Sequence, residues 1–280
     1  MKNSDINMRS IKDYTQSNRM AWNQIMPAHQ KAARARLDEA FKNSSHSVIK
    51  SPEMDEWRKL DFKGKDIAHL CCNNGIELMS LKNMGAGHCV GFDICDLAIE
   101  EAQHRAMTSN NECQFVCTDV FDISEEYNST FDIVYITIGA LGWMPDINAF
   151  FKKVKDILKP TGAIFIYEIH PVTEMLPTDG DHEAHPLQIM EPYFKNEPYE
   201  DTAGLDYVGK TDEETSTRYW FVWKISDIMM AIIDQGFNIS RFVEYSHDVS
   251  EMHSRNQEAS KEAGIEIPMS YILVANGSAT

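Results

Sequence analysis

Residues 64–96 read GKDIAHLCCNNGIELMSLKNMGAGHCVGFDICD, and this stretch decides the fold. A short apolar run at 66–70 is joined by a polar turn to a helical pattern at 76–84. Two glycines end the helical pattern, and a second apolar run at 88–92 leads directly to Asp93. Strand, glycine-containing turn, helix, strand and acid in this order form half of a nucleotide-binding α/β unit.

The turn after the first strand differs from that of a dinucleotide-binding protein. Such a turn needs three glycines so that its backbone can approach a pyrophosphate, and here only Gly75 is present. Asn73 and Asn74 tolerate left-handed backbone angles. Asp93 follows Gly75 by 18 positions, close to the roughly 20 expected of an acid that reaches ribose hydroxyls. The turn therefore suits a nucleoside-type cofactor better than NAD.

This stretch resembles the first motif of the class I S-adenosylmethionine-dependent methyltransferases, which usually reads acid-x-Gly-x-Gly-x-Gly. Here His69 stands at the position of the acid, Cys71 at the first glycine and Asn73 at the second. The stretch is most similar to a bacterial subgroup of small-molecule methyltransferases whose motif runs His-Leu-x-Cys-x-x-Gly. The resemblance extends from Asn18 to about Ala275.

The resemblance implies a doubly wound, Rossmann-like α/β fold with a seven-stranded sheet whose last strand is antiparallel. It also implies an N-terminal helical lid at 1–60 and a methyltransferase domain at 61–280 that binds S-adenosylmethionine. Alternation of strands and helices along the chain independently indicates a doubly wound parallel sheet. An aromatic-rich insertion at about 171–224, after strand five, should cap the substrate site. Two of its strands are expected at about 204–209 and 217–224.

The other expected elements follow from hydrophobic periodicity and from turn residues. The pattern at 9–35 predicts an amphipathic helix interrupted at Pro27, and Pro52 is placed to open a short helix that ends at Leu60. The remaining predictions are strands at 113–120, 131–138 and 163–169, helices at 96–109, 146–158 and 226–236, and a closing antiparallel pair at 237–245 and 269–274, joined by a linker at 246–266.

A cofactor site is expected where these strands end. By resemblance, Asp119 accepts a hydrogen bond from the adenine amino group, and the backbone N–H of Val120 meets a ring nitrogen. The alternative is that Asp119 caps the following turn. Two acids at two successive strand ends favour the cofactor. The predicted cofactor-binding residues are Tyr14, Trp22, Leu70, Cys72, Asn73, Gly75, Asp93, Ile94, Asp119, Val120 and Ile138.

The N-terminal helix is a candidate lid over the cofactor. Tyr14 and Trp22 would offer aromatic faces to the cationic sulfonium. The resembled subgroup opens with an Asn-x-x-Ala-Trp segment, which spans residues 18–22 here. The alternative is a helix that only packs on the core.

Methyl transfer depends mainly on positioning the acceptor and excluding water, but an oxygen or nitrogen acceptor usually must also lose a proton. His170, just after the fifth strand, is the first candidate base, with Glu168 to orient it. It could instead only hold the turn into the cap. Tyr193, Tyr207 and Trp223 are weaker candidates, for contact with the acceptor, and His247 is a spare candidate. The aromatic cap indicates a planar or apolar acceptor.

Composition excludes several classes of partner. The formal net charge of −17 disfavours nucleic acid and anionic membranes as partners. No apolar stretch approaches the roughly 20 residues of a membrane span, and the N-terminus has no signal-peptide pattern, so we expect a cytoplasmic protein.

The six cysteines include no C-x-x-C pair and should be reduced and at least half buried. The residues 181–185, DHEAH, should form a solvated turn. No metal site is predicted.

Three functions were compared on these grounds. The preferred one is S-adenosylmethionine-dependent methyl transfer to a small molecule, most simply at oxygen or nitrogen. The alternative is a non-catalytic module that binds S-adenosylmethionine or a nucleoside. The weakest is a nicotinamide oxidoreductase, because the glycines are missing. An enzyme should have a closed acceptor cavity between the fourth strand and the cap, whereas in a module side chains should fill that cavity.

Overall fold

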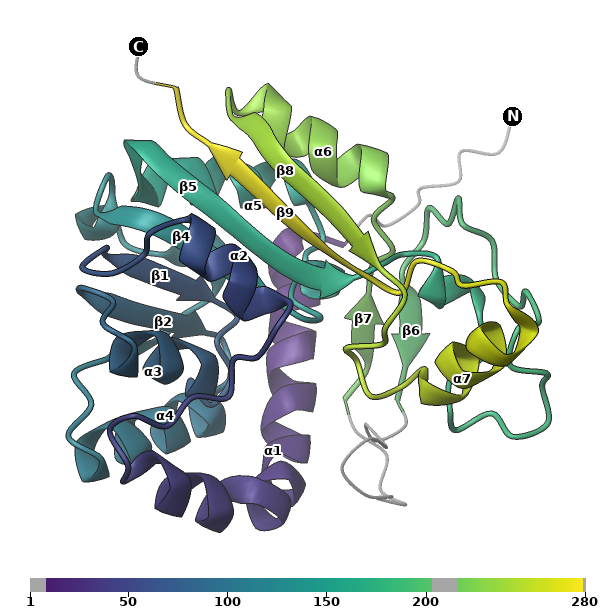
Figure 1. Ribbon diagram of the computed structural model, residues 1–280, viewed down its shortest axis with the longest axis horizontal. Coiled ribbons are helices and arrows are strands. Elements are labelled where there is room, and N and C mark those ends of the chain that lie inside the picture. The colour runs from purple at the N-terminus through teal and green to yellow at the C-terminus, as the bar shows by residue number, and fades with distance from the viewer. Residues whose placement is uncertain (1–8, 203–215, 279–280) are drawn as a thin grey trace.

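A seven-stranded sheet with helices on both faces forms the centre of the molecule (Figure 1). The computed structural model describes residues 9–202 and 216–278. The strand order is β3-β2-β1-β4-β5-β9-β8. The bounds of these strands are β1 Ile67–Leu70, β2 Cys89–Asp93, β3 Gln114–Cys117, β4 Phe131–Thr137, β5 Leu158–Ile169, β8 Asn238–Tyr245 and β9 Ser270–Asn276.

The direction of the strands confirms the predicted fold class. Strands β3, β2, β1, β4 and β5 pair in parallel, and β9 is antiparallel to both of its neighbours, β5 and β8. The last strand is therefore antiparallel, as expected, and it lies inside the sheet rather than at its edge. The carboxyl ends of the five parallel strands meet at one edge, where open α/β sheets bind their ligands.

Each face of the sheet has its own apolar core. Helices α5 (Ile147–Ile157) and α6 (Ile225–Asp234) cover one face, and α2 (Glu53–Lys59), α3 (Ile76–Asn83) and α4 (Asp96–Thr108) cover the other. Strand β4 shows why its sequence is almost continuously apolar: Val134 and Ile136 pack on the first face, Ile133 and Tyr135 on the second.

The turn after β1 depends on left-handed backbone angles. Gly75 has φ +77°, and a Cβ atom there would lie 2.4 Å from the Phe115 ring, so no larger residue fits. Asn73 has φ +46°, which agrees with its predicted tolerance of this region. Cys71 also has a positive φ, +53°, and this was not predicted from its residue type.

Helix α1 (Ile11–Phe41) differs from its prediction. Ser10 and Asp13 form a capping box at its start. The expected interruption at Pro27 is wrong, because the helix continues through the proline and runs past residue 35 to Phe41. Figure 1 shows its two halves running in different directions, as expected where a proline removes a backbone hydrogen bond. The helix packs beside α4 and β7.

The cap segment (residues 171–202 and 216–224) carries a small second sheet of two antiparallel strands, β6 (Tyr199–Asp201) and β7 (Arg218–Trp220). The strand predicted at 204–209 lies outside the described residues, and the one predicted at 217–224 is limited to β7. Helix α7 (Ser254–Ala263), within the expected linker, was not predicted. Short 3₁₀ helices follow β3 (η1, Val120–Asp122; η2, Glu125–Tyr127), β4 (η3, Leu141–Trp143) and β5 (η4, Thr173–Met175).

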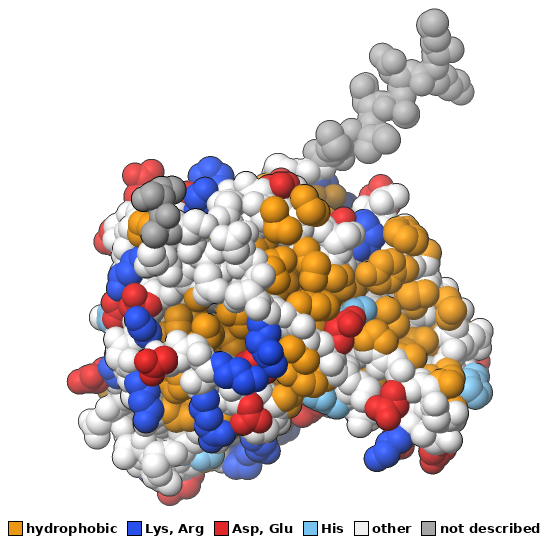
Figure 2. All heavy atoms as spheres, turned by 45° about the horizontal axis from the view of Figure 1, so that its top comes forward, with side chains coloured by type: hydrophobic (Ala, Val, Ile, Leu, Met, Phe, Trp, Pro, Cys, Tyr) orange, Lys and Arg blue, Asp and Glu red, His pale blue; other side chains and the backbone are white. Residues whose placement is uncertain are grey.

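Apolar side chains gather on one part of the surface. Figure 2 shows them on the part of this face formed by α6 and the cap segment, where Ile189, Met190, Phe194, Met230 and Ile233 are exposed. In the described ranges, no helix is long and apolar enough to cross a membrane. The six cysteines are free, and Cys117, which is exposed, is the exception to the expected burial.

Candidate active site

The carboxyl edge of the sheet brings together the turn after β1, Asp93 at the end of β2 and Asp119 after β3. The Asp93 carboxylate accepts hydrogen bonds from the backbone N–H groups of Asn73 and Cys95, each at 2.8 Å. Burial raises the pKa of Asp93, and hydrogen bonds from the N–H groups of Cys95, Asn73 and Ile94 oppose that rise. A carboxylate has about four acceptor positions, so Asp93 can also accept from ligand hydroxyls.

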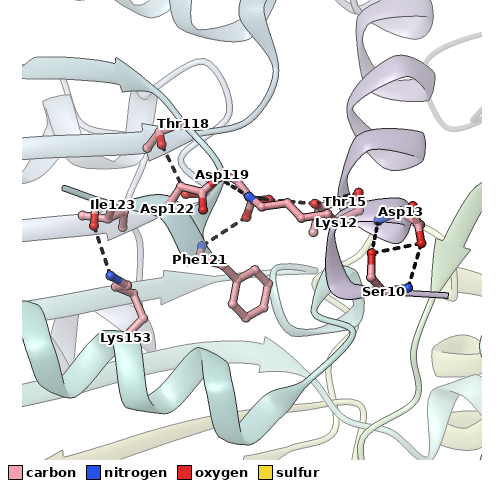
Figure 3. Close-up of polar contacts among 10 residues, drawn as sticks. All are labelled: Ser10, Lys12, Asp13, Thr15, Thr118, Asp119, Phe121, Asp122, Ile123 and Lys153. Atoms are coloured by element: carbon pink, nitrogen blue, oxygen red, sulfur yellow. Dashed lines mark hydrogen bonds and ion pairs between the residues drawn. The ribbon is translucent and has the colours of Figure 1, made fainter. Parts of the chain in front are cut away.

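Asp119 is already engaged by helix α1 (Figure 3). Its Oδ2 atom accepts a hydrogen bond from Thr15 Oγ1 at 2.7 Å and pairs with Lys12 Nζ at 3.1 Å. Its Oδ1 atom accepts from the Phe121 N–H at 3.1 Å and thereby caps η1. The capping role weighed against cofactor binding is therefore present. A ligand amino group could use the free position on Oδ1, or could replace Thr15 and Lys12 on Oδ2.

His69 lies where the resembled motif has an acid, but in the structure its imidazole ring is uncharged. It is buried, and its Nε2 atom lies 2.8 Å from Thr137 Oγ1. Burial lowers the pKa of His69 to about 3, so the ring is uncharged at neutral pH. Its Nδ1 atom has no hydrogen-bond partner within the described part of the chain.

Helix α1 contacts both the cofactor edge and the cap. Tyr14 packs edge-on against Tyr219 and Phe221, with ring centroids 4.9 and 5.2 Å apart. Trp22 packs against Trp143 of η3, with centroids 5.5 Å apart. Sequence reasoning did not assign a role to the buried Asn18 side chain. It donates to the Tyr219 carbonyl at 3.1 Å and accepts from the Tyr219 N–H at 2.7 Å.

A small cavity of about 30 Å³, room for about one water molecule, lies between η3, the end of β5, η4 and β7. This is the place, between the fourth strand and the cap, at which an enzyme was expected to have its acceptor cavity. The lining residues are Leu141, Gly142, Glu168, Ile169, Pro171, Glu174, Trp220, Phe221, Val222, Trp223, Ile228 and Tyr271.

Glu168 holds the loop after β4 at one wall of this cavity. Its carboxylate accepts from the backbone N–H groups of Gly139 at 2.8 Å, Leu141 at 2.9 Å and Ile169 at 2.7 Å. Burial raises the pKa of Glu168 to about 7 despite these bonds. The expected pairing of Glu168 with His170 is therefore wrong, because the carboxylate turns toward the loop.

Two further polar groups line the cavity, and neither was predicted. Glu174 Oε1 accepts from the Trp220 indole N–H at 3.0 Å, and burial raises the pKa of Glu174 to about 7. The hydroxyl of Tyr271 is buried and has no hydrogen-bond partner among the described residues. Glu174 falls in an irregular segment and Tyr271 in an apolar strand, so no local pattern in the sequence marks them.

His170 and Tyr193 lie outside the cavity lining. His170 Nε2 is 3.1 Å from a Glu244 carboxylate oxygen, and Nδ1 accepts from the Val172 N–H at 3.2 Å, so both ring nitrogens are engaged. Burial lowers the pKa of His170, against the effect of Glu244. The Tyr193 hydroxyl accepts from the Ile225 N–H at 3.3 Å. A catalytic role for either residue stays a prediction.

The other predicted site residues occupy different surroundings. The side chains of Leu70, Cys72 and Val120 are buried in the two cores, so only their backbone groups could meet a ligand. Ile138, directly after β4, is 41% exposed. His247 contacts the Tyr167 hydroxyl at 2.7 Å, and Tyr207 lies outside the described residues. In the ranges 9–202 and 216–278, no three His, Cys, Asp or Glu side chains are arranged to hold a metal ion.

One family model matches the part of the chain that forms the carboxyl edge of the sheet. Residues 67–162, from β1 into β5, match the family model described as a methyltransferase domain. These residues are similar to a methyltransferase domain. The match supports an enzyme with S-adenosylmethionine-dependent methyltransferase activity, and it implies S-adenosylmethionine as the cofactor.

Solved structures share the fold over most of the chain. One described as an S-adenosylmethionine-dependent methyltransferase, from Listeria monocytogenes, is 19% identical, with a TM-score of 0.59 over 81% of this chain and 99% of its own. Another, from Mesorhizobium loti, is 20% identical, with a TM-score of 0.55 over 79% and 97%. A [4+2]-cyclase is also similar, at 12% identity and a TM-score of 0.57 over 94% and 97%. No curated protein matches the chain.

The same fold occurs in a cyclase, so the likeness between structures establishes only the fold. The activity is supported by the match to the family model. At the carboxyl edge of the sheet, Asp93 fits the cofactor, because its carboxylate keeps acceptor positions for ribose hydroxyls.

Proposed function

We propose that the protein transfers the methyl group of S-adenosylmethionine to an oxygen or nitrogen atom of a small-molecule acceptor. The observation that supports this is the cavity at the carboxyl ends of β4 and β5, which Trp220 and Phe221 of the cap segment close. Ligands of open α/β sheets bind outside these strand ends, so the cavity neighbours the edge that carries Asp93 and Asp119.

In this proposal Asp93 binds the ribose and Asp119 the adenine. When bound, S-adenosylmethionine supplies a methyl group on a positively charged sulfur, which leaves as the neutral thioether of S-adenosylhomocysteine. The turn between Leu70 and Gly75 faces the methionyl part.

The acceptor would be held by the walls of the cavity. Two backbone N–H groups, of Gly139 and Leu141, donate to the Glu168 carboxylate and fix the loop after β4, so this wall is preorganised. Apolar and aromatic side chains make up most of the remaining lining and exclude water. Residues 1–60 would act as a lid, and the described contacts of α1 with Asp119 and Tyr219 support this.

A non-catalytic binding module is the alternative. In a module we expected side chains to fill the space between the fourth strand and the cap. The space there is small, about 30 Å³, and it is the polar groups in its wall, rather than its size, that favour the enzyme.

Calorimetric titration with S-adenosylhomocysteine, with NAD titrated in parallel, tests the cofactor site. We expect micromolar binding of S-adenosylhomocysteine and no binding of NAD. Acceptors are then screened by formation of S-adenosylhomocysteine from S-adenosylmethionine. Failure to bind S-adenosylhomocysteine would overturn the proposed function, and binding of NAD alone would indicate an oxidoreductase.

A further inference from the structure

We propose that the acceptor is an amine: the cavity binds its ammonium group against the Glu168 and Glu174 carboxyl groups and the Trp220 indole, and Glu174 removes its proton. This inference rests on the proposed function and specifies its substrate class.

The charges of the cavity wall favour a cationic ligand. Glu168 and Glu174 are both among the lining residues, and the lining includes no Lys, Arg or His side chain. Two carboxyl groups held in a largely apolar wall without a counter-charge are costly to ionise. Burial accordingly raises the pKa of both Glu168 and Glu174 to about 7. A bound ammonium group would supply the missing positive charge, whereas an alcohol would not.

The two carboxyl groups have different roles. Glu168 accepts three backbone N–H bonds, of which those from Gly139 and Leu141 position the loop after β4. The Glu174 carboxylate accepts one side-chain hydrogen bond, from the Trp220 indole, and keeps acceptor positions for a ligand. Glu174 is therefore the group that can take a proton from the acceptor.

An unpartnered hydroxyl is independent support for a polar ligand. Tyr271 is fully buried, lines the cavity, and its hydroxyl has no partner within the described part of the chain. A buried hydroxyl without a hydrogen bond costs roughly 1–3 kcal/mol. A phenol both donates and accepts, so an amine N–H group would satisfy it.

Aromatic faces complete the recognition of a cation. Trp220, Phe221, Trp223 and Tyr271 all line the cavity. Indole and phenol rings attract ammonium groups through their negative faces. The Trp220 ring is held in place on one side by Glu174 and on the other by the backbone of Gly142, where an added Cβ atom would lie 2.4 Å from the indole.

The reaction balances with these groups. A bound ammonium group gives one proton to the Glu174 carboxylate. The freed nitrogen lone pair forms the bond to the methyl carbon, the carbon–sulfur bond breaks, and its electron pair stays on sulfur. The methylated nitrogen again carries a positive charge, and the thioether is neutral.

The test is binding to the full chain saturated with S-adenosylhomocysteine. Primary amines from methylamine to benzylamine are titrated by calorimetry, each against the alcohol of the same carbon skeleton. We expect at least one amine to bind at least tenfold more tightly than its alcohol. Glu174→Gln and Tyr271→Phe should each weaken that amine about tenfold and leave the affinity for S-adenosylhomocysteine unchanged. Glu112→Gln, at an exposed carboxylate far along the sheet, should change neither affinity.

Each outcome separates the two proposals. If S-adenosylhomocysteine does not bind, the proposed function fails. If it binds but no amine is preferred over its alcohol, the amine inference fails and methyl transfer stands. An amine that binds equally to both cavity variants would also overturn the inference, because it would bind elsewhere. Tyr271→Phe removes only a hydroxyl, so it keeps the test decisive if Glu174→Gln does not fold.

Discussion

Asp93 is the side chain on which the cofactor assignment depends most. Its two hydrogen bonds to backbone N–H groups hold it at the end of β2. Asp93→Asn replaces the charged acceptor, and losing a charge-assisted hydrogen bond to a ribose hydroxyl costs about 1.5–3 kcal/mol. The affinity for S-adenosylhomocysteine, measured by calorimetry, should therefore fall roughly tenfold to a hundredfold.

Asp146→Asn is a suitable control for that substitution. Asp146 caps α5 through the N–H groups of Asn148 and Ala149, and asparagine caps a helix equally well. The control should bind S-adenosylhomocysteine as the original protein does. Equal affinity of both variants would mean that the ribose site lies elsewhere.

Glu53 makes the stability of the protein depend on pH. It is buried beneath the sheet beside Tyr135 and Trp57, and burial raises its pKa from 4.5 to about 7. Between these values the folded state keeps a proton that the unfolded state has released. The free energy of unfolding should therefore decrease as pH rises from about 4.5 to 7, by up to about 3 kcal/mol from this group.

Glu53→Gln should remove this contribution to the pH dependence of the free energy of unfolding, which is measured by urea unfolding at pH 5 and pH 8. The difference in free energy of unfolding between the variant and the original protein should favour the variant more at pH 8 than at pH 5. Glu56→Gln is the contrasting control on the same helix. Burial raises the pKa of Glu56, but hydrogen bonds from Arg241 and Lys59 outweigh it and lower the pKa, so that variant should lose stability above about pH 4.5. Parallel pH profiles for Glu53→Gln and the original protein would contradict the assignment.

The strand-end acids were predictable from sequence, but the polar wall of the cavity was not. Asp93 and Asp119 each follow an apolar run, so sequence order alone locates them. Glu174 and Tyr271 lie about a hundred residues apart, and only the pairing of β5 with β9 brings their elements together. His170 shows the converse: its position after β5 was anticipated, but its partner, Glu244, comes from β8.

At the scale of elements, hydrophobic periodicity located the sheet and most helices, because the inner strands, such as β1 and β4, are covered on both faces. The periodicity did not predict the structure correctly where tertiary contacts determine it. Helix α1 passes through Pro27 because its packing against α4 and β7 outweighs the loss of one backbone hydrogen bond. Strands β6 and β7 have three residues each, too few to show a period.

The contact between α1 and Asp119 predicts that the helix competes with the cofactor. Thr15→Val removes the hydroxyl that shares Asp119 Oδ2 with Lys12 and so gives the adenine amino group one more acceptor position. The affinity for S-adenosylhomocysteine should rise several-fold, since a hydrogen bond of this kind contributes about 1 kcal/mol. Thr15→Ser keeps the hydroxyl and should behave as the original protein does. A lower affinity for Thr15→Val would mean that α1 stays on Asp119 when the cofactor binds.

The loop after β4 and the cap are fitted closely at Gly142. In Gly142→Ala the new Cβ atom would lie 2.4 Å from the Trp220 indole, so the ring and β7 must move. Overpacking of this kind costs about 1–3 kcal/mol, which should appear in urea unfolding together with a changed near-ultraviolet circular dichroism of tryptophan. Gly180→Ala, where the nearest atom is 3.8 Å away, should change neither signal. An unchanged spectrum for Gly142→Ala would contradict the fit.

At the scale of the whole molecule, Asn18 joins the N-terminal helix to the cap. Its side-chain amide makes two hydrogen bonds with the backbone of Tyr219, as a neighbouring strand would. Asn18→Ala leaves both Tyr219 groups without these partners, at a cost of about 1–3 kcal/mol each if they stay buried. Amide hydrogen exchange should accelerate together in α1 and β7, while β1, β4 and β5 keep their protection. Acceleration in only one of the two elements would show that they move separately.

Thr15 and Asn18 stand one helical turn apart, and this spacing has a kinetic consequence. Through Thr15 the helix contacts the carboxylate assigned to adenine, and through Asn18 it contacts the strand that closes the acceptor cavity. Departure of the helix from one contact therefore disturbs the other. We expect the two substrates to bind in a compulsory order, with S-adenosylmethionine first, and release of S-adenosylhomocysteine, rather than methyl transfer itself, to limit the rate of turnover.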